Sequence, residues 1–259
     1  MLSLTQPGKT MPNRNGAKDT RCQAQRIRGW CLSALLLVTP AALLADDFLY
    51  EIRDSVLYIT GYTGPGGAVT IPSTLDGHTV EAIADGVFWN CSSLTSVSIP
   101  DSVQLIGACA FADCSSLTNV SIPDSVSTIG TASFENCSSL TSVSIPDSVT
   151  TIADCAFRSC SSLTNVTIPN SVPTIGQASF ENCSSLTSVS IPDSVKTIGL
   201  NAFAGCERLE KVMVGSGVTF IDSVAFAYCA NLTRVAFWGN APVIRSEERR
   251  VGKECRSRW

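Results

Sequence analysis

The residues of this chain that could do chemistry are its cysteines and its one histidine. Twelve cysteines occur in 259 residues, and seven of them recur at intervals of 23 residues: Cys91, Cys114, Cys137, Cys160, Cys183, Cys206 and Cys229. Thiolates could bind metal or form disulfides, but the chain has no close CxxC pair and no histidine beside this column. Equivalent positions of successive copies also point in parallel, so their side chains do not converge. We therefore interpret the column as buried thiols that fill one position of a core.

Catalytic groups are equally sparse. His78 lies in the polar stretch STLDGHTV, where we expect a solvated loop histidine rather than a general base. The many serines and threonines lack a base to activate them, and the glycine-rich GYTGPGG has no lysine to hold a phosphate. We predict no catalytic residue, no metal site and no cofactor, so the chain is not expected to be an enzyme unless a catalytic domain is fused to it.

The elements that position these residues repeat. CSSLTSVSIPDSV occurs identically at Cys91–Val103, Cys137–Val149 and Cys183–Val195, with near copies between them. A fixed period of this length is typical of a solenoid. One unit offers too few apolar side chains to offset the entropy of ordering it, so stability must come from stacking.

Each unit contains a strand pattern. In LTSVSIP, Leu94, Val97 and Ile99 are expected to point inward, with Ser96 and Ser98 pointing largely outward. The following proline ends the ladder because it has no N–H to donate. VQLIG is expected to form a second, shorter extended piece, and ACAFADC a helical turn that places its phenylalanine in the core.

The full pattern, Leu-x-x-Val-x-Ile-Pro-x-Ser-Val-x-x-Ile-Gly-x-x-Ala-Phe-x-x-Cys, resembles the leucine-rich repeats of the BspA-like, Treponema-type subclass. The likeness covers about residues 68–244, seven to eight repeats with the last incomplete. It implies a leucine-rich-repeat solenoid with a parallel strand ladder and a convex side of short extended and helical-turn segments. Residues 46–67 resemble the N-terminal β-hairpin cap of such proteins, with a turn at Asp54-Ser55. The end of the stack opposite this hairpin is expected to be exposed and frayed.

The two ends of the chain differ from the repeats. Residues 1–45 have the basic, apolar and small-residue pattern of a signal peptide with a cleavage point at Ala45, and the apolar run is too short to span a bilayer. A buried hydrophobic helix is the alternative. Residues 245–259 form a basic tail without the repeat, either a disordered tail or foreign sequence.

Charge restricts the partners. The net charge is -4, but residues 46–244 hold 18 acidic and 6 basic side chains. An acidic body argues against a nucleic-acid-binding surface, and no transmembrane span is expected.

The outward strand positions form the candidate binding face. It is rich in hydroxyls and nearly uncharged until the last two units: Ser96, Ser98, Asn119, Ser121, Ser142, Ser144, Asn165, Thr167, Ser188, Ser190, Lys211, Met213, Arg234 and Trp238. The family resemblance implies a secreted or cell-surface protein that mediates protein–protein interaction or adhesion, with a protein or cell-surface macromolecule as partner. A structural surface component without a specific ligand is the alternative. We expect the C-terminal units to contribute most to binding, because arginine and tryptophan are enriched in binding hot spots.

Overall fold

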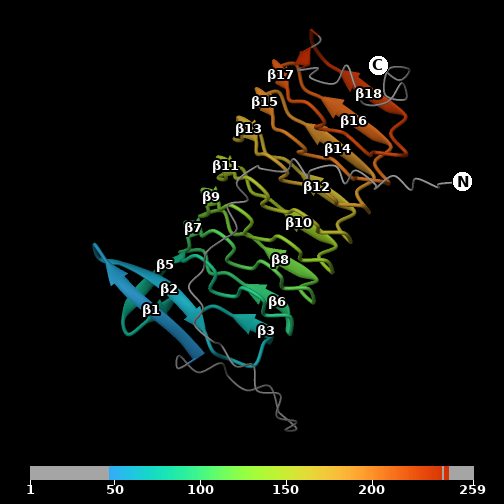
Figure 1. The fold of residues 1–259 in the computed structure, drawn as a ribbon. Helices are drawn as coiled ribbons and strands as arrows, with labels where there is room; N and C mark the ends of the chain where they lie inside the picture. The colour runs from blue at the N-terminus through green and yellow to red at the C-terminus, as the bar shows by residue number, and fades with distance from the viewer. Residues whose placement is uncertain (1–46, 241, 245–259) are drawn as a thin grey trace, which may run out of the picture.

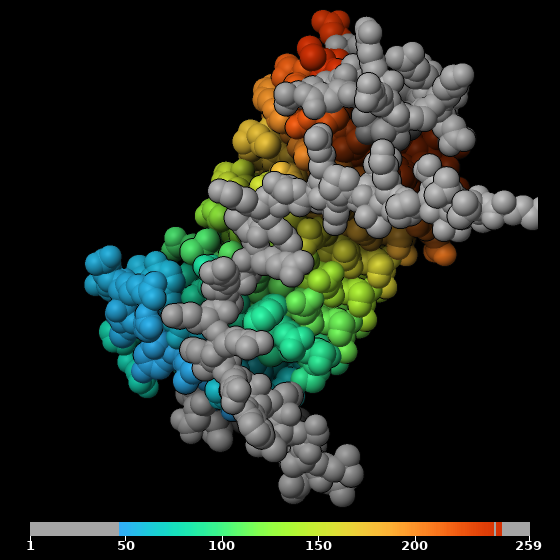
Figure 2. All heavy atoms as spheres, in the orientation of Figure 1, coloured from blue at the N-terminus to red at the C-terminus, as the bar shows by residue number. Residues whose placement is uncertain are grey.

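The chain forms a solenoid in the computed structural model, which describes residues 47–240 and 242–244. The predicted signal peptide and the basic tail lie outside these residues. Two rows of strands run along two sides of the stack (Figure 1). A space-filling view shows the units following one another along an elongated body, with the N-terminal hairpin projecting at one end (Figure 2).

The first row is an eleven-stranded sheet. Its path runs through β1 (Phe48–Arg53), β2 (Val56–Tyr62), β5 (His78–Ile83), β7 (Leu105–Ile106), β9 (Thr128–Ile129), β11 (Thr151–Ile152), β13 (Thr174–Ile175), β15 (Thr197–Ile198), β17 (Phe220–Ile221) and β19 (Val243–Ile244), and β4 (Thr74–Leu75) pairs with β5. The short extended piece expected from VQLIG is therefore confirmed as β7.

The second row, which we call the strand face, holds the candidate binding residues. It consists of a five-stranded ladder and a three-stranded ladder: β3 (Gly67–Thr70), β6 (Leu94–Ser98), β8 (Asn119–Ser121), β10 (Ser142–Ser144) and β12 (Asn165–Thr167), then β14 (Ser188–Ile191), β16 (Lys211–Val214) and β18 (Arg234–Phe237). Paired strands are parallel, and each residue of β8 faces its equivalent 23 residues later in β10. The burial patterns confirm the inward and outward assignment, because the middle residue of β8 and of β10 is buried and the residues on either side of it are exposed.

A column of phenylalanines runs through the core. Rings from Phe88 to Phe226 stack nearly parallel, with centroids 5.0–5.4 Å apart between neighbours. The segments that carry them form successive turns, in which Ala112 N–H donates to Cys109 O at 3.1 Å. Each turn also bonds to the next unit, for example from Phe111 N–H to Ser133 O at 2.7 Å. The turn that places phenylalanine in the core was therefore predicted correctly.

The N-terminal hairpin covers the first unit. β1 and β2 are antiparallel, and the turn between them falls at Asp54 and Ser55, as expected from the sequence. Phe48 and Tyr62 are packed with ring centroids 5.2 Å apart, and Tyr62 in turn lies 5.0 Å from Phe88. The aromatic column therefore extends into the hairpin, which takes the place of a preceding unit.

His78 is exposed, as predicted, but it does not lie in a loop. It opens β5 and pairs with Leu75 of β4. The turn between these strands uses Asp76 and Gly77 at positive φ, 47° and 78°. These left-handed residues reverse the chain tightly, so the polar insertion forms a small hairpin instead of an irregular loop.

Candidate functional site

The strand face presents nearly all of the predicted residues to solvent. Ser98, Ser121 and Ser144 are exposed, and so are their equivalents in the following strands up to Met213. Ser96 is the exception in β6, because it is only partly exposed. Trp238 is 70% exposed and lies one residue beyond β18, at the position where most other units carry the proline that follows the strand. The predicted set therefore lies on one surface, with Trp238 at its margin.

The parallel register arranges these side chains in two rows. One row joins Ser96, Asn119, Ser142 and Asn165, and the other joins Ser98, Ser121, Ser144 and Thr167. The ladder is interrupted between β12 and β14. Beyond this interruption, Ser188 pairs with Lys211, Lys211 pairs with Arg234, and Ser190 pairs with Met213. The structure thus brings the predicted residues together as two groups rather than one continuous array.

The hydroxyls of the face are not equivalent. The threonines at its margin donate to the preceding unit, as Thr118 Oγ1 does to Thr95 O at 3.1 Å and Thr141 Oγ1 to Thr118 O at 3.3 Å. Among the described residues, Ser98 and Ser121 make no such side-chain hydrogen bond. The hydroxyls of Ser98 and Ser121 are therefore available to a ligand. The threonine hydroxyls at the margin are already hydrogen-bonded to the backbone of the preceding unit.

An opening lies within the strand face. A groove of about 420 Å³ lies along β12 and β14, and its lining includes Asn165, Thr167, Ser188 and Ser190. These four belong to the predicted binding set. Their common position beside one groove was not predicted.

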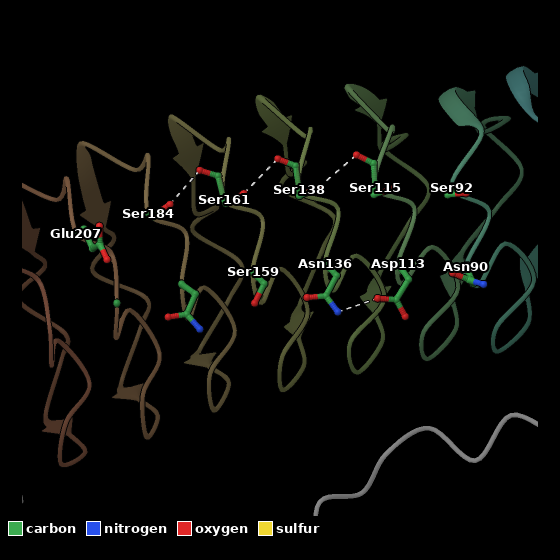
Figure 3. Close-up of a pocket in the computed structure, with 12 residues that line it drawn as sticks. Asn90, Ser92, Asp113, Ser115, Asn136, Ser138, Ser159, Ser161, Ser184 and Glu207 are labelled. Atoms are coloured by element: carbon green, nitrogen blue, oxygen red, sulfur yellow. Dashed lines mark hydrogen bonds between the residues drawn. The ribbon is translucent and has the colours of Figure 1, made fainter.

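A second groove, which sequence reasoning missed, runs along the turns. It has a volume of about 620 Å³ and is lined by two rows of mostly small polar residues (Figure 3): Asn90, Asp113, Asn136, Ser159, Asn182 and Gly205, with Ser92, Ser115, Ser138, Ser161, Ser184 and Glu207. The signal in the sequence is the small polar residue or glycine that precedes six of the seven cysteines of the column; the seventh, Cys229, follows Tyr228.

Local structure accounts for the chemistry of this second groove. Its first row has positive φ, for example 59° at Asn136, a conformation that asparagine, aspartate and glycine tolerate best. Asn136 Nδ2 donates to Asp113 Oδ1 at 2.8 Å, and Ser138 Oγ donates to Ser115 O at 3.4 Å (Figure 3). These groups bond to one another between units, so the strand face is the better candidate for binding.

The thiol column is buried, as predicted. Cys114, Cys137, Cys160, Cys183 and Cys206 have no exposed surface, whereas Cys91 and Cys229 at its ends are partly exposed. Each buried thiol donates to a phenylalanine carbonyl 26 residues earlier, as Cys137 Sγ does to Phe111 O at 3.2 Å. Burial raises the pKa of Cys137 and of Cys183 to about 12. These thiols are therefore protonated and unreactive at neutral pH.

The described residues contain no group of three or more histidine, cysteine, aspartate or glutamate side chains placed to hold a metal ion. Nor does the described part of the chain include a helix of the length and hydrophobicity needed to cross a bilayer.

Known proteins share this architecture. Residues 81–184 and 134–248 match the BspA type leucine rich repeat region, in six copies. A leucine-rich repeat protein of T. pallidum is 35% identical, with a TM-score of 0.67, over 73% of this chain and 89% of that one. A leucine-rich repeat protein from Bacteroides ovatus is 30% identical, with a TM-score of 0.68, over 78% of this chain and 54% of that one, so the chain spans about half of its length. Comparison with curated proteins gave no match.

Proposed function

Because the chain belongs to the BspA type leucine-rich repeat family, whose members are in general protein-interaction scaffolds, we propose that it binds a protein partner through its strand face. The observation that carries this proposal is the pair of exposed, uncharged rows that the parallel register draws across successive strands. Leucine-rich repeat solenoids are a non-enzymatic scaffold family, and an extended surface of this kind suits a partner that contacts several units at once.

The proposal includes a location. The protein is exported by the signal peptide at residues 1–45 and acts in secreted form or at the cell surface, where many copies raise the strength of modest individual contacts. N-terminal sequencing of the protein recovered from its producing cell tests this. Cleavage near Ala45 is expected, and an intact start at Met1 or Met11 on cytoplasmic protein contradicts export.

Binding is tested with a phage-displayed library of random peptides selected on the full chain. The strand-face variant carries Ser98→Glu, Ser121→Glu and Ser144→Glu, which crowd and charge three adjacent strands. We expect it to weaken the selected peptides by roughly 100-fold, since each lost hydrogen bond is worth about 1 kcal/mol.

The matched control adds three acidic side chains beside the eleven-stranded row, at the residues that immediately precede β7, β9 and β11. Gln104→Glu, Ser127→Glu and Thr150→Glu change exposed residues that also follow one another at intervals of 23 residues. This control should bind like the native chain. Peptides that tolerate the strand-face variant would instead favour the alternative, a structural surface component without a ligand on this face.

A further inference from the structure

Charge is distributed unevenly along the stack. Residues 46–195 hold 15 acidic and 2 basic side chains, whereas residues 196–244 hold 3 acidic and 4 basic side chains. The C-terminal units, which carry β15 to β19 (Figure 1), are therefore the part of the body without an excess of negative charge. An acidic partner is repelled by most of the stack and meets the weakest repulsion at this end.

An acidic row beside the strand face ends at the same place. In four of the five units from β6 to β14, the residue that follows the proline after the strand is an exposed aspartate, Asn170 being the exception: Asp101, Asp124, Asp147 and Asp193. The last two units have Ser216 and Gly239 at this position. The carboxylate of Asp193 accepts hydrogen bonds from Ser216 N–H at 2.6 Å and from its hydroxyl at 2.9 Å. The negative border of the strand face therefore stops before the units of β16 and β18.

Two cations replace the small polar residues of the strand face in these units. Lys211 of β16 and Arg234 of β18 are register partners, and both are exposed. Like charges directly opposite one another on adjacent strands repel. Among the described residues, neither side chain makes an ion pair or hydrogen bond, and Glu210, the acid directly before Lys211, pairs with neither. The two positive charges are therefore free to meet an anion from outside.

Exposed apolar side chains accompany the two cations. Met213 is 40% exposed on β16, two residues beyond Lys211, and Trp238 is 70% exposed just beyond β18. The backbone N–H of Trp238 donates to Val214 O at 2.9 Å, which holds the tryptophan beside the end of β16. Methionine, tryptophan and arginine are the residues enriched in the central parts of protein interfaces. The two strands thus offer positive charge and apolar contact together.

We propose that β16 and β18 take up an acidic segment of the partner protein, with Asp or Glu carboxylates placed against Lys211 and Arg234. The inference rests on the proposed function and names the chemistry of the partner at one end of the strand face. A guanidinium can bind a carboxylate through two parallel hydrogen bonds, and an ammonium group acts as a point charge. The hydroxyl-rich strands contact the remainder of the partner, so the acidic segment determines which end of the face each part of the partner occupies.

The experiment removes the two charges and compares the result with a matched control. Peptides selected on the full chain from the random library are tested against the double variant Lys211→Gln and Arg234→Gln. The control variant, Arg53→Gln and Lys196→Gln, also removes two exposed cations, one from the hairpin and one from the residue before β15. We expect about a tenfold loss of affinity for the first variant and less than about twofold for the control. All four side chains are exposed, so both variants should unfold at the same urea concentration as the native chain.

The selected peptides supply a second measurement. They should be richer in Asp and Glu than the unselected library, and changing these residues to Asn and Gln should weaken binding to the native chain by about tenfold. The same change should have little further effect on binding to the Lys211→Gln and Arg234→Gln variant, because the charges that it pairs with are already gone. Raising the ionic strength from about 0.01 M to about 1 M shortens the Debye length from about 30 Å to about 3 Å. This should weaken the acidic peptides and leave their amide versions nearly unchanged.

The outcomes separate the two proposals. If the selected peptides show no excess of Asp and Glu, or if the Lys211→Gln and Arg234→Gln variant binds them like its control, the acidic partner is wrong. Loss of binding in the triple Glu variant would then still support the strand face as the site. If the peptides ignore both the triple Glu variant and the Gln pair, the proposed function fails, and the acidic partner fails with it. Binding of the chain to heparin, a sulfated polysaccharide, without binding of any peptide overturns the assignment of a protein partner.

Discussion

The two sides of the solenoid behave differently at the joint where the strand face is split. On the turn side, Phe180 N–H donates to Ala202 O at 2.8 Å, and the rings of Phe180 and Phe203 stack 5.3 Å apart, as they do elsewhere. The eleven-stranded row also continues there, with two register pairs between β13 and β15. The core and turns therefore hold the units together at this joint, so strand pairing can be interrupted on the strand face without separating the units.

The largest expected effect is a loss of folding stability at alkaline pH, caused by deprotonation of the buried thiols. Burial raises the pKa of five thiols above the ordinary value of 9.0. As the pH rises, the thiols of the unfolded chain lose their protons before those of the folded chain. The stability that the buried thiols contribute is therefore fully present below pH 9 and is lost as the pH rises toward 12. Each thiol should lower the free energy of unfolding by about 1.4 kcal/mol per pH unit in that range, or about 7 kcal/mol for five at pH 10.

Urea unfolding at pH 8 and pH 10 measures this slope. A variant with Cys160→Ala and Cys183→Ala should be less stable at pH 8, because it has cavities, but should lose less stability between the two pH values. If the free energy of unfolding falls equally between the two pH values in the native chain and in this variant, the buried thiols do not cause the loss of stability.

The next effect concerns one ring of the phenylalanine column. Phe157→Ala removes a fully buried side chain that stacks on a ring at either side, so unfolding should cost about 3–5 kcal/mol less. Thr167→Ala, in the same unit but on the strand face, should change stability by no more than about 0.5 kcal/mol. Comparable losses for the two variants would remove the contrast between the sides.

A smaller effect should appear in hydrogen exchange. Backbone amides of β14 should take up deuterium faster than those of β10 and β16, because β14 has no ladder with the strand that precedes it. The amides of β13 and β15 should exchange at similar rates. Equal protection of β10, β14 and β16 would mean that the strand face is continuous in solution.

The smallest effect on stability is expected at the C-terminal strands. Lys211→Ala, Met213→Ala and Arg234→Ala change exposed side chains, so each should alter the free energy of unfolding by about 0.5 kcal/mol or less. Peptide binding should nevertheless weaken if these charged and sulfur-containing units add affinity beside the groove. Unchanged binding would confine recognition to the hydroxyl-rich strands.

Much of the architecture follows from the sequence because one unit is repeated many times. The 23-residue period predicts stacking, and the alternation around Val97 fixes which side chains face solvent, since a strand has a period of two. The cysteine column could be placed in the core because no metal-binding or disulfide partner lies near it in the sequence, and a free thiol packs as a small hydrophobic group. Each of these inferences depends on which way a side chain points.

The split of the strand face could not be predicted in this way. β12 and β14 have nearly the same sequence as strands that do pair, and whether a ladder forms depends on small differences in spacing between units. Asn170 and Pro173 were the visible departures, but neither residue lies in a strand. The groove along the turns was missed for another reason, because its asparagines are needed at positive φ and show no sign of a ligand.

The identity of the repeated segments has a consequence for how the number of repeats can change. Three copies of a thirteen-residue stretch lie 46 residues apart, at Cys91, Cys137 and Cys183. Misaligned recombination between the coding segments of such copies would add or remove two whole units and leave the stacking on either side the same, since every ring stacks on its neighbour at nearly the same distance. A change of this kind alters the length of the stack by roughly 10 Å at a spacing near that of adjacent strands. The length of the protein would therefore change in fixed steps of two units while the packing of the core stays the same.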